Sequence, residues 1–454
     1  MKPLALALAL LASASTWFYM NRILRADQLA DAAAHHRPRG NLSDLYPRWL
    51  GARELLLHRR NPYSPEITRE IQTGYYGRPL DPTRPDDPKD EQGFAYPVYV
   101  VFLLAPTVRL PFETVATGFR WLLVALAVAT IPLWPRVLRW TVSCGAMLIF
   151  CLLSAGWLPV VQGIKLQQLT LLVAVLLAAC GASLAGGWFF LAGGLLALAT
   201  IKPQLAWPIV LWLLLWAASD WRARRRFIYG FALVMLLLLG GAELLLPGWL
   251  RMFVAAIGQY HRYTQNQSVL VFMFGTIAGR IFELLSVVAC AAVVWRMRRR
   301  SAGSPDFGRA FALVLALTVV VVPMFAPYNQ VLLAPAILML AWREISEASS
   351  QRGSGKASET SSEKTPQKNS AEGRISADIG LPAIRLARRI AGLLFFWPWI
   401  ATLALSLASF WLTPELRHRL WPMPFYPNFI LPVLIFGLAL VETWLLEAGT
   451  PTAG

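Results

Sequence analysis

Two charged residues of this chain each lie beside a long apolar stretch of sequence. Asp44 lies in a polar segment after the first apolar run, and Lys202 lies in Ile-Lys-Pro-Gln between two further runs. A charge next to hydrocarbon is costly unless it has a partner, so such residues often mark functional sites. Together they predict a buried polar site at the edge of a lipid bilayer.

Asp44 could act as a general base. A carboxylate that stays ionised near apolar helices can accept the proton of a hydroxyl group as that oxygen attacks an activated carbon. The alternative role is structural, since Asp44 or Ser43 could cap a helix that runs through Trp49. The sequence leaves both roles open.

Lys202 has no acidic neighbour in the sequence, so its ammonium group predicts an anionic partner such as a phosphate. Alternatively, it could be a lysine at a helix end, next to the break at Pro203, whose ammonium group reaches water. Lys165 and Arg262 supply further cations. Several cations on one face of a membrane protein suit the phosphate of a lipid head group.

Amides and tyrosines close to these charges are candidates for binding a substrate. Amides bind hydroxyl groups, and aromatic faces suit stacking on sugar rings, although tyrosines also anchor loops at the membrane interface. The candidates from this reasoning are Tyr63, Tyr96, Gln167, Gln204, Asn266 and Gln267.

The elements that must position these side chains are membrane helices. Of the 454 residues, 56% are hydrophobic and only 15% are charged. Repeated apolar runs near the roughly 20 residues that cross a bilayer predict an all-α polytopic membrane protein. The net charge of +17 does not point to nucleic acid, because the arginines cluster in short loops beside apolar runs. We expect the membrane, and no nucleic acid, as a partner.

The charge pattern also predicts the topology. The basic clusters 222–226 and 296–300 should both be cytoplasmic, which requires that one apolar segment does not cross. The weakest candidate is 97–110, a short segment flanked by prolines, which we expect to be short or re-entrant. About 12 transmembrane helices (11–13) follow. A large first loop, 21–96, and the other polar motifs then face the extracytoplasmic side of the inner (plasma) membrane.

Three regions are expected along the chain. Residues 1–342 form a membrane-embedded module, 343–388 read as a disordered cytoplasmic linker because they are rich in Ser, Glu and Lys, and 389–454 form a pair of transmembrane helices. The first apolar run could be a secretory signal. We favour an uncleaved anchor, and the loop after it is exported in either case.

Several motifs follow one another in a characteristic order: Asp44 and Tyr46, Asn61-Pro62-Tyr63, Phe94-Ala95-Tyr96-Pro97, Gln167-Gln168, Ile201-Lys202-Pro203, Asn266-Gln267-Ser268 and Pro327-Tyr328-Asn329-Gln330. This order resembles the polyprenyl-phosphate-sugar-dependent glycosyltransferases of the type C membrane fold, in the bacterial α-mannosyltransferase-like group, glycosyltransferase family 87. The resemblance covers most of the chain.

The resemblance implies that Asp44 is the general base and that Lys202, with Arg262, meets the phosphate of a polyprenyl-phosphate-linked sugar, mannose as the first choice. It adds Tyr46, Tyr328 and Asn329 as substrate-binding residues. A hydroxyl group of a lipid or glycan acceptor would attack the anomeric carbon, expel polyprenyl phosphate and invert that centre. No cofactor and no metal are expected, since the donor is already activated. The family's histidine near 325–330 is replaced by Asn329-Gln330.

Two other classes of function remain open. A transporter or flippase for a lipid-linked saccharide could use Glu243 and Glu283 as coupling residues. Against it, the chain has no obvious internal repeat, and its polar motifs fall on one face. A non-catalytic subunit of an envelope-assembly complex is the third class, and it would not need both Asp44 and Lys202.

Overall fold

The computed structural model describes residues 3–34, 43–81, 83–84, 87–264, 266–341 and 372–448. All regular structure within these ranges is helical, and they contain no strand. Six helices are long and apolar enough to cross a membrane, or up to seven if a bent pair forms one span. These helices are those of a multi-pass membrane protein, as predicted, while the count of about 12 transmembrane helices stays a prediction.

Some of the six long apolar helices comprise several labelled elements in succession. The six helices are Pro3–Ala34 (α1, Pro3–Phe18; η1, Tyr19–Leu24; α2, Arg25–Ala34), Phe112–Leu138 (α6, Phe112–Thr130; α7, Leu133–Leu138), α13 (Trp221–Leu245), α16 (Thr276–Met297), the part of α19 (Glu372–Ala408) from Pro382, and Glu415–Glu447 (α20, Pro414–Leu420; η4, Met423–Asn428; α21, Leu431–Ala448). The bent pair joins α8 (Cys144–Ala155) to α9 (Leu158–Lys165) at 53°.

Shorter apolar helices fill the interior between them. They are α10 (Thr170–Ala185), α11 (Phe189–Ala199), α12 (Pro203–Ala218), α17 (Pro305–Val321) and the stretch Pro327–Ala341, which opens with the 3₁₀-helical η3 (Pro327–Leu333). Every residue of α17 from Ala310 to Val320 is buried. A helix that is apolar all round belongs in a core, and α17 is the centre of this one.

Glycines let α11 and α13 touch. A Cβ added at Gly193 would lie 2.0 Å from the carbonyl oxygen of Phe227, and one at Gly230 would lie 2.0 Å from that of Phe190. Only glycine permits such an approach of two backbones, and small residues at helix crossings are typical of membrane proteins. This crossing fixes α11, whose C-terminal end leads into Lys202.

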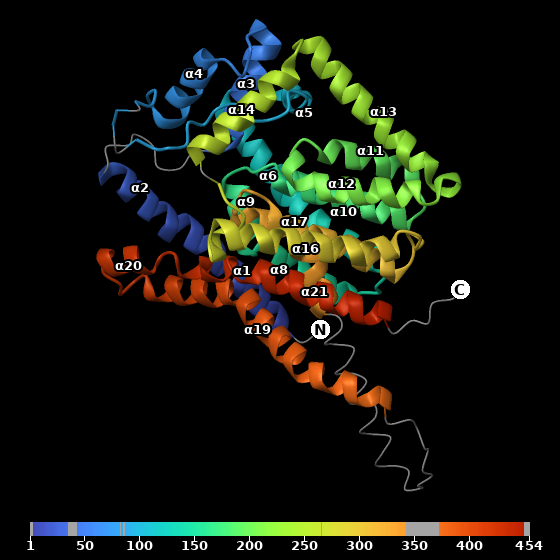
Figure 1. Cartoon of the computed structure of the whole chain (residues 1–454). Helices are drawn as coiled ribbons and strands as arrows, with labels where there is room; N and C mark the ends of the chain where they lie inside the picture. The colour runs from blue at the N-terminus through green and yellow to red at the C-terminus, as the bar shows by residue number, and fades with distance from the viewer. Residues whose placement is uncertain are drawn as a thin grey trace.

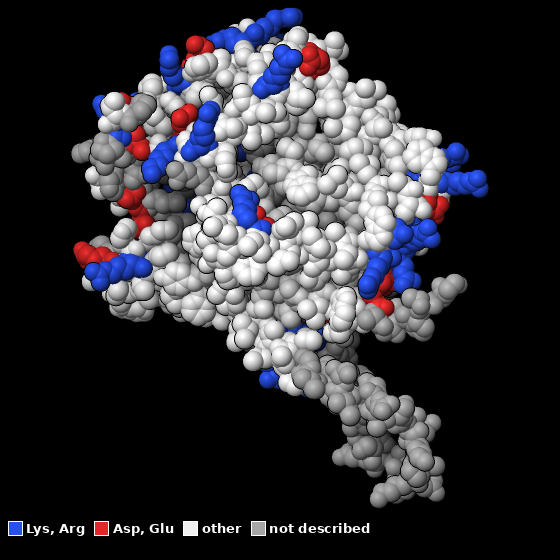
Figure 2. Space-filling view, in the orientation of Figure 1, with Lys and Arg blue, Asp and Glu red and all other residues white. Residues whose placement is uncertain are grey.

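The basic clusters 222–226 and 296–300 lie at the same end of the molecule. Figure 2 shows Lys and Arg gathered where α13 begins and α16 ends, with a largely uncharged surface between this edge and the loops at the other end. Buried Arg224 joins the two clusters, since its guanidinium donates to the carbonyl oxygens of Trp216 at 2.6 Å and Arg298 at 2.9 Å.

Short helices cover the opposite end (Figure 1): α3 (Leu45–His58), α4 (Pro65–Tyr76), α5 (Val100–Leu104) and α14 (Trp249–Thr264). The segment predicted to be short or re-entrant, 97–110, holds α5 and η2 (Ala105–Thr107), which are too short to cross a bilayer of about 30 Å. The four short helices form a cap over the bundle, and two of them, α3 and α4, come from the predicted first loop.

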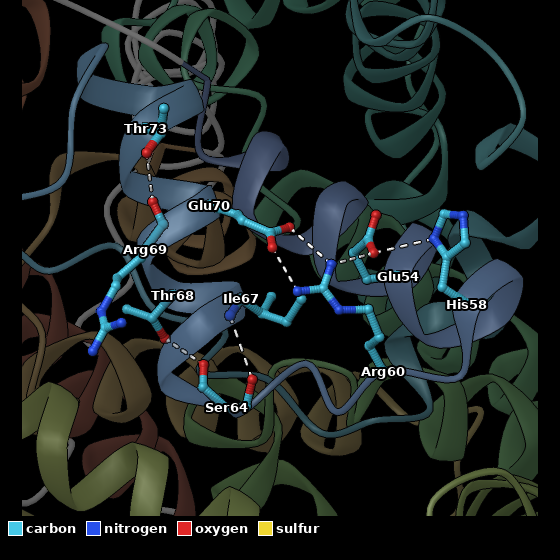
Figure 3. A network of polar contacts seen from close by, with 9 residues as sticks. All are labelled: Glu54, His58, Arg60, Ser64, Ile67, Thr68, Arg69, Glu70 and Thr73. Atoms are coloured by element: carbon cyan, nitrogen blue, oxygen red, sulfur yellow. Dashed lines mark hydrogen bonds and ion pairs between the residues drawn. The ribbon is translucent and has the colours of Figure 1, made fainter.

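An ion-pair network ties α3 to α4 (Figure 3). Arg60 Nη1 lies 2.9 Å from Glu54 on α3, and its Nη2 lies 2.5 Å from Glu70 on α4. His58 Nδ1 lies 3.1 Å from the same Glu54 carboxylate. Ser64 caps α4, because its side chain accepts the backbone N–H of Ile67. The two helices thus form one unit that holds Asp44 over the bundle.

Two boundaries differ from the sequence prediction. The first helix does not end near residue 20 but continues to Ala34, because Tyr19 and Ile23 are buried against Leu158 and Leu405. Of the predicted linker, 343–371 lie outside the described residues, and the chain is helical from Glu372.

A buried ion pair and hydroxyl contacts fix the C-terminal helices. Arg388 Nε on α19 lies 2.6 Å from Glu442 Oε1 on α21, so this part of the predicted linker has a partner in the bundle. Thr402 Oγ1 on α19 lies 3.3 Å from Ser15 Oγ and 3.4 Å from Thr16 Oγ1 on α1. The first and last parts of the chain therefore pack together.

Candidate active site

A cavity of about 340 Å³ lies beneath the cap, where α3 and α14 meet the turn between α11 and α12. Its charged and polar lining comes from distant parts of the sequence. The residues that line it are Asp44, Pro47, Arg48, Asp90, Gln92, Gly93, Ala95, Tyr96, Gln168, Lys202, Pro203, Gln204, Phe253, Ile257, Tyr260, His261, Asn266, Pro323, Met324 and Tyr328.

Asp44 immediately precedes α3, but its side chain makes no capping hydrogen bond. Its carboxylate instead accepts hydrogen bonds from the Gln168 side-chain amide and from the Tyr75 hydroxyl. Burial raises the pKa of this carboxyl above its ordinary value, while the charges of Arg48 and Lys202 lower it. A carboxylate in this setting is a stronger base than a solvated one and is held in one orientation.

Gln168 connects the carboxylate to the lysine. Its Nε2 donates to Asp44 Oδ2, and its Oε1 accepts from Lys202 Nζ at 3.0 Å. The orientation of this amide is determined by its partners, since a carboxylate can only accept and an ammonium group can only donate. The amide therefore keeps the acid and the cation one side chain apart within the same cavity.

Lys202 is only 2% exposed, which rules out an ammonium group that reaches bulk water. Besides Gln168, its Nζ donates to Thr170 Oγ1 at 2.6 Å and lies 4.9 Å from the centre of the Tyr328 ring. Thr170 in turn donates to Asn329 Oδ1 at 3.2 Å. The cation is thus positioned by α10 and η3, and it faces a cavity large enough for a ligand.

Arg48 is a second cation on this cavity. Its guanidinium lies 4.1 Å from the centre of the Tyr96 ring, and its Nη1 donates to the backbone carbonyl of Asp44. Its buried Nε has no hydrogen-bond partner among the described residues. Arg48 follows Asp44 by one helical turn, and that spacing on α3 is the sequence signal that could have identified it.

Asp90 is a second carboxylate on the cavity, and sequence reasoning missed it. Its carboxylate accepts the backbone N–H of Gln92 at 3.1 Å and the Gln92 side-chain amide at 2.9 Å. Burial raises the pKa of Asp90 to about 6. No periodic pattern marks this residue, because it lies in an irregular segment rich in Pro and Asp.

The structure brings part of the predicted residue set together. The predicted residues that line the cavity are Asp44, Tyr96, Lys202, Gln204, Asn266 and Tyr328. Asn329 lies directly behind them, where it holds Thr170.

Other predicted residues support the walls instead. Gln167 has a left-handed backbone with φ 55°, and its amide donates to the carbonyl of Ala116, so the next residue, Gln168, is the one that enters the cavity. Tyr46 packs edge-on against Phe112. Tyr63 donates to the carbonyl of Tyr96.

Three predicted residues lie away from the cavity. Lys165 donates to the carbonyl of Met20, near the charges of Arg25 and Arg120. Arg262 and Gln267 are exposed and are not part of the cavity wall. The described residues contain no group of three or more His, Cys, Asp and Glu side chains that could hold a metal ion.

A comparison with protein families matches residues 94–327, just over half of the chain, to glycosyltransferase family 87. The chain belongs to this family. It is therefore a membrane glycosyltransferase, as the order of motifs predicted. Searches of curated proteins and of solved structures found no match.

The part of the chain matched to glycosyltransferase family 87 supplies most of the cavity. It contains Tyr96, Gln168, Lys202 and Asn266, whereas Asp44 and its neighbours precede it. The cavity of this family 87 enzyme also includes His261 from α14. A histidine therefore faces the site from α14, whereas the resemblance places the family's histidine near 325–330.

Proposed function

We propose that this glycosyltransferase moves a sugar, mannose as the first candidate, from a polyprenyl-phosphate donor to a hydroxyl group of an extracytoplasmic acceptor, with inversion at the anomeric carbon. The observation that carries the proposal is the chain of contacts Asp44, Gln168 and Lys202 along one cavity wall. It offers a base for the acceptor and a cation for the departing phosphate, a short distance apart.

The reaction needs one displacement. The acceptor oxygen loses its proton to the Asp44 carboxylate and forms the new bond to the anomeric carbon. The bond from that carbon to the phosphate oxygen breaks, and its electron pair leaves with polyprenyl phosphate. Lys202 and Arg48 would stabilise the charge that develops on this phosphate. The step draws on no metal or cofactor, because the phosphate ester is already activated.

An apolar cavity next to the elements that hold Lys202 supports a lipid-linked donor. It has a volume of about 180 Å³ and lies among α6, α8, α9, α10, α19 and η3 with the helix that continues it. Leu171 and Val331 line it, and the same two elements provide Thr170 and Asn329, which hold Lys202. A phosphate at Lys202 would thus have space for its hydrocarbon chain nearby, where apolar surface favours it.

The proposed orientation places the cavity on the extracytoplasmic side. The basic clusters 222–226 and 296–300 lie at the end of the molecule opposite the cap, and such clusters favour the cytoplasm. The inner (plasma) membrane is the proposed location, with an exported lipid or glycan as the acceptor.

Transfer of radiolabelled mannose from polyprenyl-phosphate mannose to a membrane lipid extract tests the proposal. We expect Asp44→Asn to lower kcat about 10²–10⁴-fold with donor binding retained, because the variant cannot accept the proton. We expect Lys202→Ala to weaken donor binding about tenfold or more, since a charge-assisted contact is lost.

Arg262→Ala is the matched control, because it removes an exposed cation from outside the cavity, and its transfer rate should equal that of the wild type. Full activity of Asp44→Asn would contradict the assignment of the base. A wild-type protein that transfers nothing, yet moves the lipid-linked sugar across vesicle membranes, would establish the transporter instead.

A further inference from the structure

A second cavity adjoins the proposed transfer site. It has a volume of about 370 Å³, and Asp90, Tyr260, Asn266 and Tyr328 line both cavities. Tyr263 lines the second cavity but not the first. The proposed reaction gives this second cavity no role so far, although Tyr328, whose ring lies against Lys202, is part of its wall.

The aromatic residues of this cavity offer faces for a ligand with apolar C–H groups. Tyr260 and Tyr263 lie with ring centres 5.4 Å apart and planes 75° from parallel, so they present two differently oriented surfaces. Their hydroxyl groups are bonded to Asn266 and to the backbone of Gly93, which fixes both rings. Rigid, amphipathic tyrosines of this kind bind ligands at a low cost in conformational entropy.

Polar groups stand at the junction of the two cavities. The Asp90 carboxylate accepts two hydrogen bonds from Gln92 and keeps further lone pairs, since an ionised carboxylate offers about four acceptor sites. Asn266 adds an amide next to it. A carboxylate and an amide can hydrogen-bond to vicinal hydroxyl groups of a sugar ring, while the fixed aromatic faces pack against its C–H groups.

We infer that the second cavity binds the saccharide part of a glycan acceptor and directs one of its hydroxyl groups towards Asp44. This inference rests on the proposed function and names its acceptor class. A protein acceptor fits less well, because the described residues contain no strand whose edge could pair with an extended peptide. A hydroxyl group that reaches Asp44 from this side would pass Tyr328, which lies against Lys202.

The test measures binding and transfer separately, with octyl α-mannoside as the glycan probe and a serine-containing peptide as the protein probe. We expect purified protein to bind octyl mannoside by calorimetry. Asp90→Asn should weaken that binding about tenfold or more, because a charge-assisted hydrogen bond to the sugar is lost. Tyr263→Ala should weaken it as well, whereas Tyr263→Phe, which keeps the ring but loses the bond to Gly93, should weaken it less than Tyr263→Ala does.

Glu91→Gln is the matched control, since it removes an exposed charge next to Asp90 without changing either cavity. In transfer assays Asp90→Asn and Tyr263→Ala should raise KM for octyl mannoside and change KM for the donor by less than twofold. Binding of the peptide in place of octyl mannoside, or mannoside binding that is insensitive to Asp90→Asn and Tyr263→Ala, would overturn the inference. If the mannoside binds as described but the wild type transfers no sugar, the proposed function fails, and only saccharide binding in the second cavity is supported.

Discussion

At the scale of single residues, the separation of Asp44 from Lys202 by one amide is the feature with most bearing on the chemistry. A direct ion pair would hold the carboxylate against the ammonium group and leave neither free for a substrate. With Gln168 between them, the carboxylate can accept a proton and the Lys202 side chain stays available to bind a phosphate. Both partners remain in the same cavity.

Gln168→Glu should impair this arrangement, because it replaces the amide that separates Asp44 from Lys202 by a carboxylate of nearly the same size. A new carboxylate beside Asp44 would raise the pKa of Asp44 further, because two adjacent carboxylates resist ionising together. The working base is the deprotonated form, so activity rises with pH, and a higher pKa moves that rise to higher pH. We expect the acidic limb of the pH–rate profile to move up by about one unit or more, with about a tenfold loss of kcat below it.

Gln167→Asn provides the comparison, since Asn tolerates the left-handed backbone of this position and the side chain lies outside the cavity. Its profile should match that of the wild type. An unchanged profile in Gln168→Glu would show that the amide does not couple to the base.

Sequence reasoning reached some of these residues and not others. Asp44 and Lys202 are visible because each charge lies beside apolar sequence. The sequence predicts Gln167 and not Gln168 as a binding residue, because no periodic pattern reveals the positive φ of Gln167. That backbone conformation directs the side chain of Gln168 into the cavity. Asp90 was missed because its role comes from contacts across an irregular segment.

At the scale of elements, the crossing of α11 and α13 determines where Lys202 lies. The backbones meet at Gly193 and Gly230, so α11 cannot move relative to α13 without losing close contact. The all-α class could be predicted from the lengths of the apolar runs, and the short segment 97–110 from the prolines that flank it. The continuation of the first helix to Ala34 could not, because burial against α9 and α19 supports it rather than its own hydrophobicity.

Gly193→Ala should lower the stability of the protein in detergent by about 1–3 kcal/mol, because the added methyl group would meet backbone atoms that cannot rotate away. The measurement is the midpoint of thermal unfolding. Gly240→Ala on α13 is the control: no atom lies within 4 Å of its new methyl group, and alanine favours helix by up to about 1 kcal/mol. A lower midpoint for Gly240→Ala than for Gly193→Ala would contradict the packing argument.

At the scale of the whole molecule, η3 lines both cavities, the polar one through Tyr328 and the apolar one through Val331. The proposed donor has a charged head and a hydrocarbon chain, so it would contact both. No sequence pattern predicts the apolar cavity, since its lining residues come from six separate helical segments and each alone resembles ordinary membrane sequence.

Ala334→Trp should reduce the apolar cavity, which Ala334 lines, and so reduce the use of long donors. Each buried CH₂ contributes about 0.8 kcal/mol, so exclusion of even part of a prenyl chain should raise KM for a long-chain donor about tenfold or more. KM for a donor with two isoprene units should stay near the wild-type value.

Transfer assays with the two donors compare these values. Ala232→Trp, on the exposed surface of α13, controls for the bulk of the new side chain and should leave both values unchanged. Equal losses for short and long donors in Ala334→Trp would place the hydrocarbon chain elsewhere.

The contact of α1 with α19 has a consequence for biogenesis. The ribosome makes α1 first, yet the hydroxyl groups of Ser15 and Thr16 find Thr402 only after nearly the whole chain has been synthesised. Until then, these hydroxyl groups have only their bonds to the carbonyl oxygen of Ala12 within α1. Completion of the bundle is thus delayed to the end of translation, and a chain that stops before α19 would leave this face of α1 without its partner helix.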